Sequence, residues 1–255
     1  MTTINFEMDS RGVARLTLNR PEVKNAMNPE MISDVVRTLS ELSDDCRVLV
    51  IAAAGNVFCA GADLKWMGQA AMGGTTEDSA ILRGLFTAVD QCKVPVVARV
   101  QGPAIAGATG LLACCDVVVA AASAVFAFTE VRIGLVPAVI SPYVLRKTGY
   151  SFARAMFMTG ERFDAERAVQ GGLVHFAVPD EQLDTKVEEV VSNLVGGAPD
   201  ALLEARRLLS KVVGRGPEEV ADMTVEVLTQ RRGSDEAKEG IAAFLEKRKP
   251  RWVRE

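Results

Sequence analysis

The sequence predicts an α/β protein, in which a parallel sheet with crossover helices precedes a region of helices only. Two apolar runs, Arg47–Ala54 and Val94–Val100, have the length and β-branched content of strands that are buried on both faces. Apolar residues at helical spacing lie between them, as a crossover connection between parallel strands requires. From Asp180 onward, the apolar residues recur at helical spacing only.

The change in pattern also predicts how the chain is divided. Gly196–Gly197 is the best boundary, because two adjacent glycines interrupt the helical pattern there. The expected domains are a core over residues 1–195 and a helical region over residues 196–255. Prolines near the expected helix starts and after the last one place the helices at about 180–194, 199–213, 217–231 and 234–248.

The first half of the chain alternates predicted strands and helices. Val13–Asn19 alternates apolar and polar residues, which predicts a strand buried on one face. Asn28 and Pro29 suit the N-cap and the first residue of a helix that continues through Leu42. We then expect a turn with small residues over 55–64, a polar, glycine-rich connection over 68–79 and a helix over 81–92.

The second half continues the pattern in shorter elements. Glycines follow the strand that ends at Val100, and a buried helix is expected from Leu111 to Cys115. The remaining predicted strands are 116–121, 125–129 and 173–178, and the predicted helices run from 141 to Gly149, from 151 to Gly160 and from 164 to Gly171 or Gly172.

Composition excludes several functional classes. The 255 residues carry a net charge of −4, which gives no basic surface for nucleic acid. No apolar run is long enough to span a bilayer, and the N-terminal residues lack a signal-peptide pattern, so we expect a cytoplasmic protein. Five scattered cysteines are expected to be small buried hydrophobes, and one histidine without paired cysteines predicts no metal site.

Two glycine-containing turns are the candidate binding elements. Cys59–Gly61 and Ala106–Ala108 each place small residues between a buried strand and an expected helix. Small side chains let a ligand approach the backbone N–H groups at a helix start, where an anion or an oxyanion is stabilised. Spacing alone leaves two interpretations open, an oxyanion site or close-packing glycines without a ligand. The glycine signatures of dinucleotide-binding proteins, P-loop enzymes and serine hydrolases are absent.

Glu130 is the candidate acid or base. It lies in the mostly apolar segment AVFAFTEVRIGLV, and such surroundings raise the pKa of a carboxyl group toward the range useful for proton transfer. The alternative is a solvated glutamate at a strand end. Asp63 and Asp116 suit helix caps or ion pairs, and His175, in a short predicted strand without a nucleophile nearby, is expected to be structural.

Three central segments resemble the enoyl-CoA hydratase/isomerase family, also called crotonases. They are FCAGADLKWM, VQGPAIAGATGLLACCD and FAFTEVRIGLVP, in that order and spacing, and NRPEVKNAMN and AFLEKRKPRW fit as well. The resemblance covers essentially the whole chain. It implies a spiral core of ββα units, a C-terminal helical trimerisation region, and assembly as a homotrimer or a dimer of trimers.

The resemblance also implies an acyl-CoA thioester as substrate, with coenzyme A entering as part of it and no separate cofactor. By position, the backbone N–H groups of Ala60 and Gly107 would form the oxyanion hole. Lys24 and Ala26 would lie along the CoA chain. Ala60, Ala62, Asp63 and Leu64 would form the turn around the adenine and pantetheine, and Trp66 and Met67 would border the acyl pocket.

One departure from the family pattern affects the expected reaction. Hydratases of this family commonly use two glutamates; the second matches Glu130, whereas Gly110 stands in place of the first. The segment TEVRIGLVPAVISPYV resembles a subgroup that hydrates branched or carboxylated enoyl-CoAs such as methylglutaconyl-CoA, which favours hydration. A single carboxylate also suits an enoyl-CoA isomerase, and a non-catalytic acyl-CoA-binding homologue is the third possibility.

Overall fold

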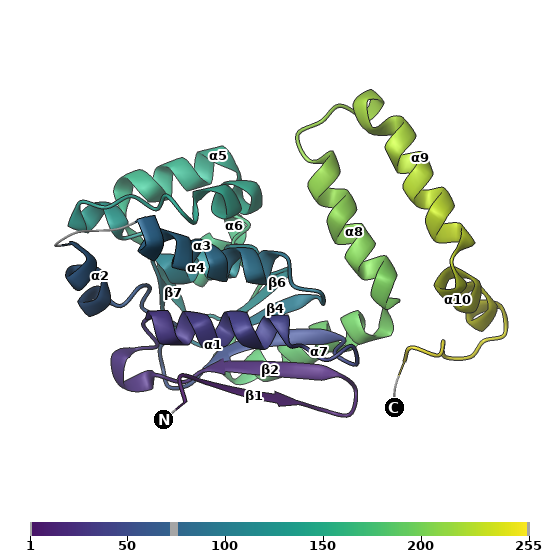
Figure 1. Ribbon diagram of the computed structural model, residues 1–255, viewed down its shortest axis with the longest axis horizontal. Helices are drawn as coiled ribbons and strands as arrows, with labels where there is room; N and C mark the ends of the chain where they lie inside the picture. Colours follow the sequence, from purple (N-terminus) through teal and green to yellow (C-terminus); the bar gives the residue numbers. More distant parts are fainter. Residues whose placement is uncertain (1, 72–75, 254–255) are drawn as a thin grey trace.

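The computed structural model describes residues 2–71 and 76–253, and its centre is a six-stranded sheet between layers of helices (Figure 1). The strands lie in the order β1-β2-β3-β4-β6-β9, and β1 and β2 pair antiparallel while the others pair in parallel. Their bounds are β1 Ile4–Met8, β2 Val13–Leu18, β3 Val48–Ala53, β4 Val96–Val100, β6 Val117–Ala121 and β9 Phe176–Val178.

Successive residues of the central strands face opposite layers. Leu49 and Ile51 of β3 join the main core, whereas Val48 and Val50 join a second cluster with α7 (Leu183–Gly196). Burial on both faces explains why the sequence of β3 is apolar without interruption, and the predicted parallel sheet is confirmed. Helices that contribute to the main core include α1 Pro29–Ser40, α3 Thr76–Asp90 and α4 Gly107–Cys114.

A second, smaller sheet lies beside the first and leads into the functional turns. Its strands are β5 Ala104–Ile105, β7 Val125–Ala127 and β8 Arg162–Asp164, in that order. Phe126 and Phe163 stack across it with ring centroids 5.8 Å apart. The remaining elements of the core are η1 Pro21–Val23, α2 Leu64–Ala71, η2 Glu130–Ile133, α5 Ser141–Thr159, α6 Ala165–Gln170 and η3 Asp180–Gln182.

The last three helices stand beside the core as an arm (Figure 1). They are α8 Pro199–Val212, α9 Pro217–Gly233 and α10 Asp235–Leu245, in agreement with the predicted all-helical region. Arg206 of α8 attaches the arm, because its guanidinium donates to the carbonyls of Cys92 (2.6 Å) and Val94 (2.8 Å) and pairs with Asp116.

Arg47 joins the core to the C-terminal region at a second point. Its side chain is buried, and it donates to the carbonyls of Val195 (3.1 Å), Gly197 (2.8 Å) and Trp252. Two of these carbonyls lie at the C-terminal end of α7, where helical carbonyls lack partners within the helix. Arg47 therefore caps α7 and fixes the chain end at the same time.

Arg47→Met is expected to lower the free energy of unfolding by about 3 kcal/mol, because hydrogen bonds from a charged donor are worth about 1.5–3 kcal/mol and buried carbonyls lose their partners. Urea denaturation measures the change. Arg37→Met is the matched control; the side chain of Arg37 is 62% exposed and, in the described part of the chain, pairs with Asp34 of the same helix, so a change within about 0.5 kcal/mol is expected. Equal stability of the two variants would contradict the role of Arg47.

Two features of the fold differ from the sequence-based prediction, and a third agrees with it. β1 was not predicted, since most of its residues are exposed and no alternation marks it. Part of the segment Gly68–Ser79, expected as a connection, is helical: α2 extends to Ala71 and α3 begins at Thr76, while residues 72–75 lie outside the described part. The two helices predicted on either side of Gly149 are confirmed: the backbone of Gly149 is not helical (φ +74°, ψ 165°), so α5 consists of two helices separated by a kink.

The cysteines and the helices agree with two further expectations. All five cysteines are buried free thiols, and burial raises the pKa of Cys59 to about 12, so they behave as hydrophobic side chains. Within residues 2–71 and 76–253, no helix combines the length and the apolar composition needed to cross a bilayer.

Candidate active site

Three chain segments run parallel to one another where the two sheets meet: the turn around Cys59, strand β5 and strand β7. Cys59 pairs with Ala104, and Ala104 pairs with Phe126. The register is held by hydrogen bonds, among them Ala106 N to Ala127 O at 2.8 Å. The segments that carry Gly107 and Glu130 therefore begin side by side, at Ala106 and Ala127.

Three residues past that register, the segments reach Ala62, Gly107 and Thr129, and Glu130 follows. The backbone N of Ala62 lies 4.0 Å from the position that a Cβ on Gly107 would occupy. In the described part of the chain, neither the Ala62 nor the Gly107 N–H donates to an acceptor. The fold thus brings two unused backbone donors together at the N-terminus of the buried helix α4, as an oxyanion site requires.

The structure differs from the prediction in one of these donors. Ala60 was expected to pair with Gly107, but its N–H donates to the carbonyl of Lys24 at 3.0 Å and is committed to the fold. The unused amide beside Gly107 is that of Ala62, two residues later. The physical reason is that Lys24 follows a turn from η1 and has a left-handed backbone, which presents its carbonyl to Ala60.

Gly61 redirects the chain between these two alanines. Its φ is +93°, and a Cβ there would lie 2.9 Å from the carbonyl oxygen of Ile105, so only glycine fits without displacement. The carbonyl of Cys59 accepts a hydrogen bond from Ile105 N of β5, whereas the carbonyl of Gly61 accepts from Met27 N at 2.8 Å. This change of partner at Gly61 leaves the next amide, that of Ala62, free beside Gly107.

Ala106, at the start of α4, has a strained backbone. Its φ is +52° and its ψ is −123°, a conformation that L-residues rarely adopt, and no side chain caps the helix at this point. The Ala106 N–H is held by Ala127 O, so the surrounding fold maintains the strain directly next to Gly107.

Ala106→Gly is expected to raise the free energy of unfolding by about 1 kcal/mol, because relief of the strained φ exceeds the extra backbone entropy of glycine. Chemical denaturation checks this. Gly134→Ala, at a φ of +77° and with nothing within 4 Å of its Cβ position, should shift stability the opposite way by a similar amount. A loss of stability in Ala106→Gly would show that position 106 is not strained.

Glu130 begins η2, three residues after β7 ends, and its carboxyl group is largely withdrawn from solvent. Burial raises the pKa of Glu130 above its ordinary value. Its Oε2 atom is buried without a hydrogen-bond partner among the described residues. The alternative of a solvated strand-end glutamate is thereby disfavoured, and the carboxyl group retains capacity to bind a proton or a water molecule from a substrate complex.

The loop Arg20–Met27, which carries Lys24 and Ala26, borders the turn that carries Ala62. It is fixed by Asn25, a residue that the sequence did not single out. Asn25 is fully buried and donates to the carbonyls of Ala54 (2.8 Å) and Val57 (2.9 Å). Its φ of +53° is tolerated by asparagine better than by most residues. An asparagine in a loop gives no sequence signal for this contact, which spans about thirty residues.

The side chains of the predicted CoA-binding turn have structural partners of their own. Asp63 forms an ion pair with Arg20 at 3.3 Å. It also accepts a hydrogen bond from the N–H of Lys65 at 3.0 Å, in the first turn of α2. Leu64 is 65% exposed beside it. Trp66, which with Met67 is predicted to border the acyl pocket, lies on the same helix and donates to Asp78 of α3 at 3.1 Å, so it joins α2 to α3.

Two residues predicted to be structural are confirmed as such. His175 accepts a hydrogen bond from Val118 N at 2.9 Å, and burial lowers its pKa to about 4, so it holds β6 in place. Asp116 accepts from Val96 N at 2.7 Å and pairs with Arg206. Among residues 2–71 and 76–253, no three potential ligands are grouped in a way that could hold a metal ion.

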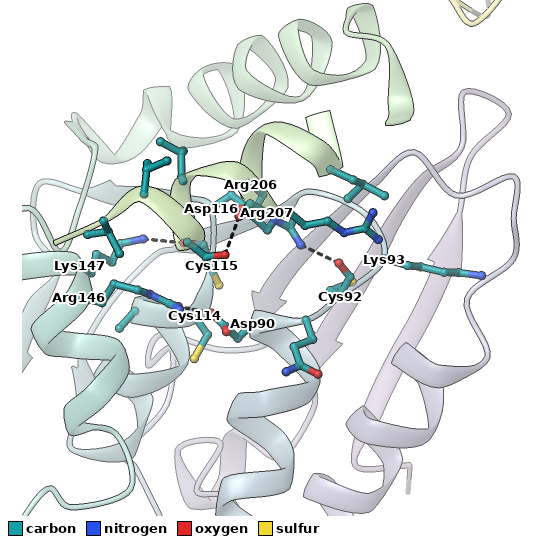
Figure 2. A pocket seen from close by; sticks show the side chains of 17 residues that line it. Asp90, Cys92, Lys93, Cys114, Cys115, Asp116, Arg146, Lys147, Arg206 and Arg207 are labelled. Carbon is teal, nitrogen blue, oxygen red and sulfur yellow. Dashed lines mark hydrogen bonds and ion pairs between the residues drawn. The ribbon is translucent and has the colours of Figure 1, made fainter. Parts of the chain in front are cut away.

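A cavity of about 870 Å³ lies between the core and α8, lined by Cys92, Lys93, Asp116, Lys147 and Arg206 among others (Figure 2). The core residues of this lining precede β4 and β6 or lie within α5, whereas the turns that carry Ala62 and Gly107 follow β3 and β4. The cavity is therefore at the opposite ends of the parallel strands from the candidate active site. Most of its cations are paired with carboxylates or carbonyls.

Comparison with known proteins finds relatives that match nearly the whole chain. Residues 8–255 match the profile of the enoyl-CoA hydratase/isomerase family. Enoyl-CoA hydratase EchA19 of Mycobacterium tuberculosis is 32% identical over 248 residues, with 93% of this chain and 91% of that protein covered. The crystal structure of an enoyl-CoA hydratase from Shewanella pealeana aligns with a TM-score of 0.93 at 35% identity, over 98% of this chain and 96% of that one. Pseudomonas aeruginosa AtuE aligns with a TM-score of 0.92 at 34% identity, over 99% and 100% of the two chains.

Proposed function

The chain belongs to the enoyl-CoA hydratase/isomerase family, and from this premise we propose that it adds water across the α,β double bond of an enoyl-CoA thioester. One arrangement carries the proposal: two unused backbone amides, those of Ala62 and Gly107, lie next to each other, and the buried carboxyl group of Glu130 follows the strand β7 that pairs with β5, the strand leading into Gly107. The amides suit the thioester oxygen, and the carboxyl group suits proton transfer at the neighbouring carbons.

In the proposed reaction, the thioester oxygen accepts hydrogen bonds from Ala62 and Gly107. Ionised Glu130 takes a proton from water while the hydroxide oxygen bonds to the β-carbon, and the double-bond electrons move onto the thioester oxygen as an enolate. Glu130 then returns the proton to the α-carbon. Loss of one such amide donor typically costs about 3 kcal/mol of transition-state stabilisation. The reaction consumes only water and the thioester, and we propose no cofactor apart from the coenzyme A of the substrate.

We assign the coenzyme A part of the substrate to the loops beside the oxyanion turn. Lys24 is exposed at the end of η1 and has a left-handed backbone conformation. Ala26 lies two residues further along, in the loop that Asn25 fixes. The turn from Ala62 to Leu64 begins α2 on the other side. The positive charge of Lys24 supports contact with the phosphates of coenzyme A.

The finer substrate class that we propose is a branched enoyl-CoA. The first turn of α4 is covered by apolar side chains: a Cβ on Gly107 would lie 3.0 Å from Met27 Cε and 3.9 Å from Phe86 Cζ. Such surroundings favour a hydrocarbon branch over a polar group next to the reacting carbons. A carboxylated acyl chain, as in methylglutaconyl-CoA, would in addition need a cation beyond this apolar wall.

We also propose that the helical arm mediates self-association as a homotrimer or a dimer of trimers. Large apolar side chains are exposed on all three of its helices, among them Leu209 (67%), Val225 (66%) and Phe244 (83%). Exposure of this many large apolar side chains to water is unfavourable for a single chain, whereas contact with a second copy would bury them. Light scattering coupled to size-exclusion chromatography measures the mass of the assembly.

The reaction is tested with purified protein, crotonyl-CoA and 3-methylglutaconyl-CoA in water that carries a heavy oxygen isotope. Hydration places the isotope in a 3-hydroxyacyl product. An isomerase is the second candidate, because a single carboxylate can move one proton between carbons; it would convert a 3-enoyl-CoA to the 2-enoyl isomer without isotope incorporation. Binding of acyl-CoA with turnover of none of these thioesters would overturn both enzymatic proposals.

A further inference from the structure

Gly110 has the side chain of Ile140 directly against its backbone. A Cβ on Gly110 would lie 2.1 Å from Ile140 Cγ2, 2.6 Å from Ile140 Cβ and 3.4 Å from Phe86 Cε1. The first two distances are shorter than real Cβ contacts, so no residue larger than glycine fits unless Ile140 moves. Ile140 is itself 3% exposed, at the start of α5, and has little room to withdraw.

Position 110 is within reach of the reacting carbons. It follows Gly107 by three helical residues, which is about 4.5 Å along the axis of α4. The α- and β-carbons lie one and two bonds beyond the carbonyl carbon whose oxygen is bound at Gly107. A side chain at position 110 would therefore lie near these carbons, and the place of its Cβ is taken by Ile140.

We propose that Ile140 is a specificity-determining residue, which limits the site to one carboxylate and selects enoyl-CoA thioesters that carry an alkyl substituent on the β-carbon. The side chain of Ile140 fills the volume that an acid at position 110 would need, so Glu130 performs the proton transfers alone. The apolar side chain of Ile140 would also contact a methyl group on the β-carbon and exclude water from that side of the substrate. This inference rests on the proposed hydratase function.

The packing part of the inference is tested by thermal denaturation. Gly110→Ala is expected to lower Tm strongly, because the added Cβ overlaps Ile140. Ile140→Gly removes both overlapping atoms, so the double variant should lose less Tm than the sum of the two single losses. Ile140→Val is the matched control, since it keeps Cβ and Cγ2 and should not rescue Gly110→Ala. If the Tm losses of Gly110→Ala and Ile140→Gly were simply additive, as expected for Gly110→Ala with Ile140→Val, the coupling would be overturned. This test does not depend on enzymatic activity.

The specificity part is tested by kcat/KM on 3-methylcrotonyl-CoA and crotonyl-CoA. Ile140→Gly is expected to lower the ratio of the two values about tenfold, the size of effect expected from one methyl contact in a pocket. Adding Gly110→Glu to that variant should raise activity on crotonyl-CoA at least tenfold and add a second acidic ionisation to the pH profile. An unchanged ratio in Ile140→Gly would overturn the specificity role, whereas wild-type protein inactive on both thioesters would instead count against the proposed function.

Discussion

Replacing Glu130 with glutamine is expected to lower kcat for hydration by about 10³-fold and to leave the Kd for acyl-CoA near that of the wild type. General acid–base groups contribute about 10²- to 10⁴-fold, and no second carboxylate is available at position 110 to take over. The amide side chain keeps the size of the carboxyl group but cannot accept and return a proton. Steady-state kinetics and calorimetric titration with a non-reactive acyl-CoA measure the two quantities.

The same substitution is expected to raise Tm at neutral pH. Burial raises the pKa of Glu130, so the folded state favours the protonated form more than the unfolded state does. The carboxyl group therefore loses stabilisation as the pH rises through its folded-state pKa, and the advantage of Glu130→Gln should be larger at pH 8 than at pH 4. Glu161→Gln, at an exposed position, is the control and should change neither Tm nor kcat.

An unchanged kcat in Glu130→Gln would remove Glu130 from the reaction, and a lower Tm would show that its carboxylate has a stabilising partner. Wild-type kcat/KM should fall on the acid side with an apparent pKa above the usual value for glutamate, since the reaction begins with the ionised form. The variant should lack this ionisation. Activity that is independent of pH in the acid range would contradict the assigned role.

Replacing Ala62 with proline is expected to lower kcat by about 10²- to 10³-fold, the cost of one oxyanion donor. The substitution removes the N–H of Ala62, which has no acceptor among the described residues, and keeps the neighbouring bonds of Gly61 and Asp63 to Met27. The φ of Ala62 is not positive, so the proline ring is not excluded by the sign of φ. Steady-state kinetics and Tm together separate loss of chemistry from loss of folding.

Ala60→Pro is the matched comparison, because it removes the hydrogen bond from Ala60 N to Lys24 O instead. We expect a loss of about 1–2 kcal/mol in stability and a kcat close to that of the wild type. The reverse pattern would restore Ala60 as the oxyanion donor. If the ring itself perturbs either variant, an amide-to-ester replacement made by semisynthesis removes the same N–H without a ring, and the expected order of effects is unchanged.

The elements that the sequence predicts well are those whose own pattern of apolar residues shows which faces are buried. β3 is apolar throughout and β4 is apolar except for Arg99, because both faces of these strands are buried, and α1 shows its buried stripe at helical spacing. β1 has no such pattern, and β5 is two residues long, so its role in aligning Ala104 with Phe126 follows only from pairing. The glycines of Gly68–Ser79 suggested a connection, yet two helices flank residues 72–75.

The site shows the same division between local and distant information. Glu130 is recognisable because its apolar neighbours surround it in sequence. Ala60 and Ala62 look alike in the sequence, and only the distant carbonyl of Lys24 decides which amide remains free. Ile140 is thirty residues from Gly110, so the contact between them is invisible until the fold is known.

The fit between Gly110 and Ile140 sets the order in which this protein could acquire a second acid during evolution. An acidic residue that arises first at position 110 meets a filled space, and the resulting intermediate would be removed by selection for folding. A smaller residue that arises first at position 140 leaves a void, a milder defect that a later acid could fill. The mutational path toward two-carboxylate chemistry is therefore open in one direction only, which would tend to preserve the single-carboxylate form across its descendants.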